Sequence, residues 1–256
     1  VKNALLAYAW DEESGYFGYA VQGQEGVHIL RTEAGENYNK GVDGVTPLIA
    51  GICSKEQEKQ LLKHLKSPEE LWSPVGISTV DMSASYYYDN GYWNGSVWCP
   101  YQYFLWKAML DIGEGQFAFD IAHRGLNSWK QEIEFSYNTF ELIQIETERG
   151  GWFHQFSGLS TPISIWYNAY YKRGTLTTGY DTWIEKKEIS EDVDYAEIVY
   201  STTGTHTGVL LIVMNSLYHY DVEIDGKKAE FIEREEGVIE ITLNRKEGVI
   251  IIYRDE

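Results

Sequence analysis

The sequence contains few cysteines and few basic residues for its length. Only Cys53 and Cys99 occur among 256 residues, so no disulfide framework is implied, and both are expected to be small buried side chains. The 21 lysines and arginines are outnumbered by 39 aspartates and glutamates, which gives a formal net charge of −18. A surface this negative repels phosphate backbones and anionic lipid headgroups, which argues against nucleic-acid and membrane partners.

Targeting and metal-binding patterns are also missing. There is no signal-peptide pattern and no apolar run of the roughly 18 residues that a membrane span needs. The first residue is Val1 rather than Met, so the compartment stays open, with the cytoplasm slightly favoured. No group of His and Cys residues has the spacing of a metal site, and no cofactor is expected. What the chain does have is 43% hydrophobic and 15% aromatic residues, enough for a sizeable core.

Helical patterns dominate the first two thirds of the chain. Ser54 stands before Lys55-Glu56-Gln57 in capping-box spacing, and leucines 61, 62 and 65 share one face, which predicts a helix over 55–66. The start signal recurs at Ser67-Pro68 and predicts a short helical turn. The apolar segment 4–9 is typical of the end of a helix. Further helices are predicted at about 100–112, 114–132 and 161–173.

The pattern changes period from about residue 185. The charged run 185–192 is interpreted as a solvated connector, whereas 208–214 and 248–253 are typical of short buried strands. Between them, Asp225-Gly226 supplies the positive φ angles that a tight hairpin turn requires. The last 72 residues are therefore expected to form a small all-β domain.

Aromatic residues and a carboxylate form the most informative motif. Trp93 and Trp98 flank Gly95, and Glu141 follows later in another aromatic setting. Sugar rings present apolar C–H faces and polar edges, so indole platforms beside a carboxylate favour a carbohydrate site.

The order of several motifs resembles the C-terminal part of the catalytic domains of glycoside hydrolase family 63 and its mannosylglycerate-hydrolase and trehalase-like relatives. The resemblance covers roughly residues 1–180. The motifs that carry it are Trp10-Asp11 to Tyr16-Phe17, Gly44 to Gly51, Tyr92 to Trp98, Phe140 to Thr147 and Phe153 to Gly158.

The resemblance implies a mainly α fold: part of a six-hairpin α/α barrel over 1–184, followed by a small β-sandwich-like domain over 185–256. It also implies inverting hydrolysis of α-glycosidic bonds by two carboxylic acids. Glu141 corresponds to the general base of the family, and Thr147 to a threonine later in the same motif. The chain departs from the family at Ile143 and Ile145, where an aromatic residue and a proline are usual, and at Asn94, where arginine is usual.

Six residues in these motifs are the candidate substrate-binding residues, and no metal ligands are expected. Each also has a structural interpretation: the tryptophans as core residues, Asn94 as a brace of its turn, and the histidine as a structural side chain. The candidates are Trp93, Asn94, Trp98, Trp152, His154 and Phe156.

Other carboxylates compete for the catalytic roles. Glu146 and Glu148 are nearby alternatives for the base, although charged residues in such a loop are usually solvated. In the family that the chain resembles, the general acid lies upstream of the Trp10-Asp11 motif, so it is expected to be absent from this chain. Asp43 and Asp81 are the possible substitutes if the chain is complete.

The expected carbohydrate-active site is therefore incomplete. The helices predicted before residue 184 number half of those in a closed six-hairpin barrel, and an open barrel exposes more apolar surface than a monomer tolerates. We expect the missing N-terminal part of the same polypeptide, or else a second chain, to complete it; the third solution is that the helices close around each other in a smaller bundle. The alternatives are a non-catalytic carbohydrate-binding or degenerate glycosidase fragment, and a structural module that serves another subunit.

Overall fold

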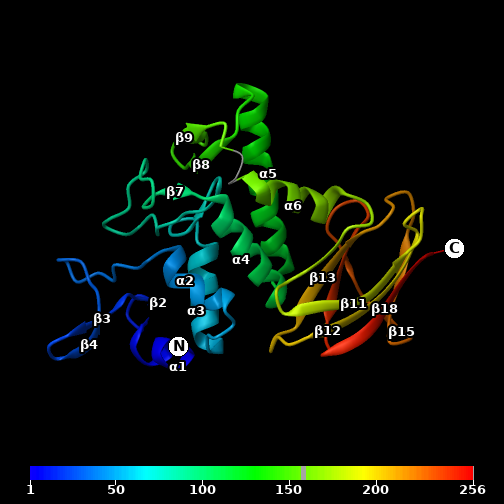
Figure 1. Ribbon diagram of the computed structural model, residues 1–256, viewed down its shortest axis with the longest axis horizontal. Helices are drawn as coiled ribbons and strands as arrows, with labels where there is room; N and C mark the ends of the chain where they lie inside the picture. The colour runs from blue at the N-terminus through cyan, green and yellow to red at the C-terminus, as the bar shows by residue number, and fades with distance from the viewer. Residues whose placement is uncertain (157–159, 256) are drawn as a thin grey trace. The chain divides into compact units, whose positions relative to one another are not determined.

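The computed structural model describes residues 1–156 and 160–255 (Figure 1). It divides into two compact units. The first comprises residues 1–104 and 124–161, and the second comprises 105–123 and 162–256. Two helices therefore run from one unit into the other along the chain: α4 (Cys99–Asp111) and α5 (Gly115–Ser136). The domain boundary predicted after residue 184 stays a prediction.

The expectation of a mainly α protein is wrong. Across the described residues 29% are helical and 32% are in strands, distributed over six helices and eighteen strands. The physical reason is that the segments between helices pair with one another as short hairpins. Strands of two residues depend on backbone hydrogen bonds with partners in neighbouring loops, so they leave no period-2 pattern in the sequence.

The first unit combines short helices with these hairpins. The helices are α1 (Lys2–Tyr8), α2 (Val42–Ile49) and α3 (Lys55–Lys66), with the first part of α4 and the second part of α5. The strands are β1 (Trp10–Asp11), β2 (Tyr16–Phe17), β3 (Ala20–Gly23), β4 (Gly26–Ile29), β5 (Trp72–Ser73), β6 (Gly76–Ile77), β7 (Ser96–Val97), β8 (Phe140–Gln144) and β9 (Gly150–His154).

Local sequence signals account for several of these elements. The predicted helix over 55–66 is confirmed, with Ser54 and Gln57 forming a reciprocal capping box at its start. The signal at Ser67-Pro68 produces only a hydrogen-bonded turn, closed by the amides of Glu70 and Trp72 on the Ser67 carbonyl. The core of the unit contains Tyr16, Val45, Leu48, Leu61, Leu65, Leu71, Ile77, Val97 and Leu142.

The second unit contains α6 (Thr161–Tyr171) and two antiparallel sheets. One sheet has the order β10-β13-β17-β16 and the other β11-β12-β18-β14-β15. Their strands are β10 (Leu176–Thr178), β11 (Thr182–Ile189), β12 (Tyr195–Thr202), β13 (Gly208–Val213), β14 (Tyr220–Ile224), β15 (Lys227–Ala229), β16 (Ile232–Glu233), β17 (Val238–Leu243) and β18 (Glu247–Arg254).

The two sheets share one apolar core, because inward-facing residues of β12, β13, β14, β17 and β18 form a single buried cluster. The predicted hairpin at Asp225-Gly226 is confirmed: both residues have positive φ angles, and Ile224 pairs with Lys227 across the turn. The expected connector at 185–192 is wrong, since most of it belongs to β11. That strand lies at the sheet edge and exposes most of its side chains, so its composition is that of a solvated segment.

Candidate active site

Glu141 lies on β8, the central strand of the small sheet β7-β8-β9. The pairing of β8 with β9 shifts register here: Phe140 pairs with His154, but Leu142 pairs with Gly151. One extra residue of β9 therefore stands opposite Glu141, and Trp152 in this bulge has a φ of 65°. Bulges re-aim side chains, and a left-handed backbone at a tryptophan is strained. The strain is located beside the candidate base.

The carboxyl group of Glu141 is shielded from solvent. The residue is 8% exposed, and its Oε1 accepts a hydrogen bond from the hydroxyl of Tyr92. Its Oε2 is buried and has no hydrogen-bond partner among the described residues. The hydrogen bond to Glu141 is the main cause that raises the pKa of the Tyr92 hydroxyl above its ordinary value, so this phenol stays protonated.

Tyr92 is surrounded by three indole rings. Its ring makes edge contacts with Trp93, Trp98 and Trp152 at centroid distances of 5.3, 4.9 and 4.8 Å. Trp93 and Trp98 stack with their centroids 4.1 Å apart, and the Trp98 indole N–H donates to the Tyr92 carbonyl. All three tryptophans around Tyr92 were thus predicted from the sequence as candidate site residues, but not the tyrosine itself, which makes the contact with Glu141.

The loop 86–95 holds these rings through close backbone contacts. A Cβ atom added to Gly95 would lie 1.8 Å from the Tyr88 carbonyl oxygen, so only glycine fits there. The side-chain amide of Asn94 donates to the Tyr86 carbonyl at 2.9 Å. Asn94 therefore braces the loop, and its predicted contact with substrate stays a prediction.

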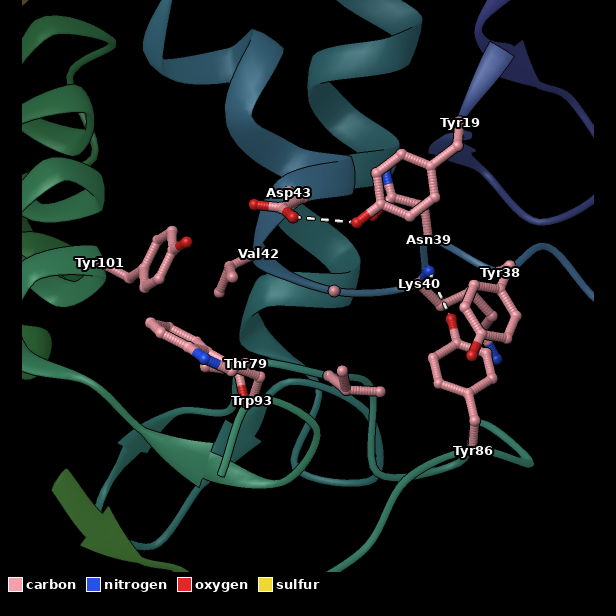
Figure 2. Close-up of a pocket in the computed structure, with 12 residues that line it drawn as sticks. Tyr19, Tyr38, Asn39, Lys40, Val42, Asp43, Thr79, Tyr86, Trp93 and Tyr101 are labelled. Atoms are coloured by element: carbon pink, nitrogen blue, oxygen red, sulfur yellow. Dashed lines mark hydrogen bonds between the residues drawn. The ribbon is translucent and has the colours of Figure 1, made fainter. Parts of the chain in front are cut away.

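Trp93 also lines a pocket of about 280 Å³ in the first unit. In Figure 2, Trp93 and Tyr101 lie at one end of the pocket, and Tyr38 and Tyr86 at the other. Trp93 is 55% exposed, so its ring is available as a platform. The full lining comprises Tyr19, Tyr38, Asn39, Lys40, Gly41, Val42, Asp43, Thr79, Val80, Tyr86, Trp93 and Tyr101.

Hydrogen bonds fix the polar groups of this pocket. The Tyr19 hydroxyl donates to Asp43 Oδ2 at 2.9 Å, and the backbone N–H of Lys40 donates to the Tyr86 hydroxyl at 2.7 Å (Figure 2). Burial, followed by the bond to Asp43, raises the pKa of Tyr19 to about 12. Sequence reasoning missed the tyrosines here. The signal available was the total of 20 tyrosines, with three adjacent ones at 86–88.

The two substitute acids have different environments. Asp81 is fully buried and accepts hydrogen bonds from Tyr16 and Ser83, with Lys40 Nζ 3.4 Å away. That arrangement is typical of a structural carboxylate. Asp43, in the first turn of α2, is exposed and lines the pocket. Of the two, only Asp43 can reach a ligand in the pocket.

A second, smaller cavity of about 30 Å³ lies beside β8. Glu141 lines it together with Glu132 of α5. The Arg149 guanidinium donates two hydrogen bonds to the Glu132 carboxylate, from Nε to Oε2 at 2.8 Å and from Nη2 to Oε1 at 2.9 Å. Glu132 Oε2 also accepts a hydrogen bond from the Gly150 N–H. These bonds, the Arg149 bonds first, lower the pKa of Glu132 to about 2. The ion pair ties the β8–β9 turn to α5 and so supports the strand that carries Glu141.

The remaining predicted residues lie on strand β9 of the β8–β9 hairpin or shortly after it. Trp152, His154 and Phe156 are all exposed. Glu146 and Glu148, the rival bases, are exposed near the tip. Ser157 and Gly158 of the last predicted motif lie outside the described residues.

The described residues contain no group of three or more His, Cys, Asp or Glu side chains that could hold a metal ion. Across the same residues, none of the helices is both long and apolar enough to span a membrane.

Comparisons with known proteins relate the chain to carbohydrate-active enzymes. A family profile described as "Mannosylglycerate hydrolase MGH1-like glycoside hydrolase domain" matches residues 1–140. No match was found among curated proteins.

Several solved structures are similar. The family 63 mannosylglycerate hydrolase from Thermus thermophilus, in complex with glucose, is 21% identical, with a TM-score of 0.51, over 65% of this chain and 38% of that chain. Its complex with Tris and D-glycerate gives the same identity and TM-score over 65% of this chain and 36% of that chain. The neutral trehalase from Saccharomyces cerevisiae is 18% identical, with a TM-score of 0.47, over 65% of this chain and 28% of that chain. The chain thus spans less than two fifths of the length of these proteins.

Proposed function

Because this chain belongs to the mannosylglycerate hydrolase MGH1-like family of glycoside hydrolase domains, we propose that it takes part in the inverting hydrolysis of an α-glycosidic bond. The observation that carries the proposal is the contact between Tyr92 and Glu141. The buried carboxylate bonds to a tyrosine whose ring contacts the indole of Trp93, and Trp93 also lines the 280 Å³ pocket.

Glu141 is the general base in this proposal. Its ionised carboxylate removes a proton from the water that attacks the anomeric carbon, and Tyr92 orients it through the hydrogen bond to Oε1. A positioned base of this type contributes on the order of 10² to 10⁴ in rate. Because only Oε1 has a protein partner among the described residues, Oε2 is the atom that we assign to the attacking water.

The pocket around Trp93 is the proposed sugar site. The exposed indole offers a face for the apolar side of a sugar ring, while Asp43, Lys40 and the surrounding tyrosine hydroxyls offer hydrogen bonds to its edges. The other predicted substrate-binding residues fit this proposal in different ways. Trp152 packs on Tyr92, and Trp98 supports Trp93 by stacking. Asn94, His154 and Phe156 remain proposed contacts.

An inverting reaction needs a second carboxylic acid about 6.5 to 9.5 Å from the base, to protonate the leaving oxygen. We propose that it comes from polypeptide outside these 256 residues, either more of the same protein or a second chain. The partial coverage of the related enzymes supports this, since 38% of the mannosylglycerate hydrolase is matched.

The substrate that we propose is a small α-glycoside of glucose or mannose. The related enzyme is named for mannosylglycerate and has been crystallised with glucose and with D-glycerate, which supports a one-sugar donor joined to a short polar leaving group. A pocket of about 280 Å³ is close to the lower end of the roughly 300–1,000 Å³ range of small-molecule sites, which favours a small substrate.

The test replaces Glu141 by Gln in the complete protein, with mannosylglycerate and trehalose as substrates. We expect normal folding, unchanged substrate binding, and a loss of turnover of about 10² to 10⁴. Glu146→Gln, at the exposed hairpin tip, is the matched control and retains activity. Proton NMR of the first product should show the β-anomer. Full activity in Glu141→Gln, or loss in the control instead, would reject Glu141 as the base.

One observation favours carbohydrate binding without hydrolysis as a second candidate function: Glu141 is not among the residues that line the 280 Å³ pocket. Calorimetry that detects sugar binding through Trp93, together with no product after long incubation of the complete protein, would select this alternative.

A further inference from the structure

A groove in the second unit lies between the edges of its two sheets. It has a volume of about 560 Å³, and its lining comes from both sheets. Strand β15 supplies Lys227 and Lys228, and the turn after β17 supplies Asn244 and Arg245. Strand β16 pairs with only two residues of β17, Ile239 and Glu240. Among the described residues, the later part of β17 therefore has no strand beside it on this side. The groove therefore follows an edge that short β16 leaves uncovered.

Tyr200 of β12 is one of the residues that line this groove. Its side chain is part of the inter-sheet core and is 1% exposed, yet its hydroxyl has no hydrogen-bond partner within the described part of the chain. A buried hydroxyl without a partner destabilises a protein, so such groups are rare unless a ligand uses them. Burial raises the pKa of Tyr200, which keeps the hydroxyl available as a donor.

Donors dominate the lining of the groove. Lys227 and Arg245 contribute two cations, against one carboxylate, Glu230. Lys228 also touches the groove, but it stands opposite Glu223, so its ammonium lies on the other face of the sheet, the one that carries Tyr253. Lys228 pairs with Asp221 and Arg245 with Asp225, both outside the lining, while Lys227 has no ion-pair partner among the described residues. Lys227 is thus the cation of the lining that no carboxylate of the described residues neutralises, and it favours an anionic group in the groove.

We propose that the groove binds a small hydroxylated carboxylate, such as a sugar acid. The carboxylate would lie between Lys227 and Arg245, and the hydroxyl groups would bond to Asn244, Glu230 and the hydroxyl of Tyr200. A guanidinium and an ammonium suit a carboxylate, while amide and carboxylate side chains suit sugar hydroxyls. This site is separate from the proposed catalytic pocket, which is formed entirely by residues of the first unit.

The experiment titrates the full chain with D-glucuronate, with D-glucose as the neutral counterpart of the same ring shape. We expect calorimetry to detect glucuronate binding that Arg245→Gln weakens about tenfold, as loss of a charge-assisted hydrogen bond does. Lys227→Gln should weaken it similarly. Trp93→Ala in the first unit should leave this binding unchanged, which separates the groove from the sugar pocket.

Tyr200→Phe provides the most specific readout, because its two effects have opposite signs. Removing the unpartnered hydroxyl should raise the melting temperature of the free chain, and it should weaken glucuronate binding severalfold. Tyr253→Phe is the control: this tyrosine faces the other side of the same sheet and donates to Glu223. It should not change binding.

Three results would overturn the proposal: no glucuronate binding, equal affinity for glucose and glucuronate, or binding that Trp93→Ala abolishes while Arg245→Gln leaves it intact. A rise in melting temperature for Tyr200→Phe without loss of affinity would also overturn the role of the hydroxyl.

Discussion

The hydroxyl of Tyr92 donates to Oε1 of Glu141, joining a loop and a strand that are 49 residues apart in the sequence. The same tyrosine ring contacts Trp93, Trp98 and Trp152. One side chain thus connects the carboxylate to the aromatic residues, and most of the predictions below depend on that connection.

Tyr92→Phe removes the hydroxyl and keeps the ring. The carboxylate of Glu141 would then have neither oxygen bonded to a described protein group, so we expect the free energy of unfolding to fall by about 1–3 kcal/mol. If Glu141 is the base, kcat should fall about 10- to 100-fold while KM changes little, because hydrogen bonds to charged groups are worth about 1.5–3 kcal/mol. Tyr88→Phe in the same loop, where the side chain is 61% exposed, is the control. An unchanged kcat in Tyr92→Phe would separate the tyrosine from catalysis.

The two stacked tryptophans should respond differently to truncation. Trp93 is 55% exposed and Trp98 is 4% exposed. We expect Trp93→Ala to reduce sugar binding with little loss of stability. Trp98→Ala should cost about 3–5 kcal/mol of stability, as other large-to-small core substitutions do. Chemical denaturation and calorimetry on both variants measure this difference. Equal losses of stability would show that the ring of Trp93 is structural.

How much of the structure the sequence could predict depended on how far apart in the chain the contacting residues are. The helix over 55–66 and the Asp225-Gly226 turn are set by residues three positions apart or fewer, and both predictions were confirmed. The family resemblance was also confirmed, by the profile match over residues 1–140. The motif order behind it led to Trp93, which does line a pocket.

Contacts between distant residues were not predictable in this way. The bond between Tyr19 and Asp43 and the bond between Tyr92 and Glu141 join segments that no local pattern relates. The short strands that made the mainly α prediction wrong have the same origin, since β7 exists only because Ser96 and Val97 pair with Gln144 and Ile143. Tertiary pairing decided these elements, whatever their intrinsic propensities.

Stability should depend on pH through Glu132. Its pKa is lowered from 4.5 to about 2 in the folded chain, mainly by Arg149. A lowered pKa means that the ionised form is favoured by folding, so the stabilisation is present above pH 4.5 and is lost as the pH falls toward 2. Because Arg149 is 37% exposed, solvent screening reduces the effect to about 1–3 kcal/mol.

Glu132→Gln tests this assignment. The variant should unfold at lower denaturant concentration at neutral pH, and it should lose the part of the acid dependence between pH 4.5 and 2 that Glu132 contributes. Glu134→Gln, whose pairing with Lys130 is exposed, serves as the control and should behave as the parent chain does. An acid profile that is identical in Glu132→Gln and the parent would contradict the role of the Arg149 pair.

Gly95 should tolerate no side chain, for a steric reason that can be isolated. A Cβ at this position would lie 1.8 Å from the Tyr88 carbonyl oxygen, so Gly95→Ala must displace the backbone of the loop that holds Trp93. Gly226→Ala is the matched comparison: its φ is 71°, but nothing lies within 4 Å of the added Cβ, so only the backbone preference of about 1 kcal/mol is lost.

We expect Gly95→Ala to reduce sugar binding and to change the tryptophan fluorescence and near-ultraviolet circular dichroism, because Trp93, Trp98 and Tyr92 then separate. Gly226→Ala should leave all three signals unchanged. If Gly95→Ala retains both the spectrum and the sugar affinity of the parent, the close backbone contact does not position the indoles, and the link from the loop through Tyr92 to Glu141 loses its structural basis.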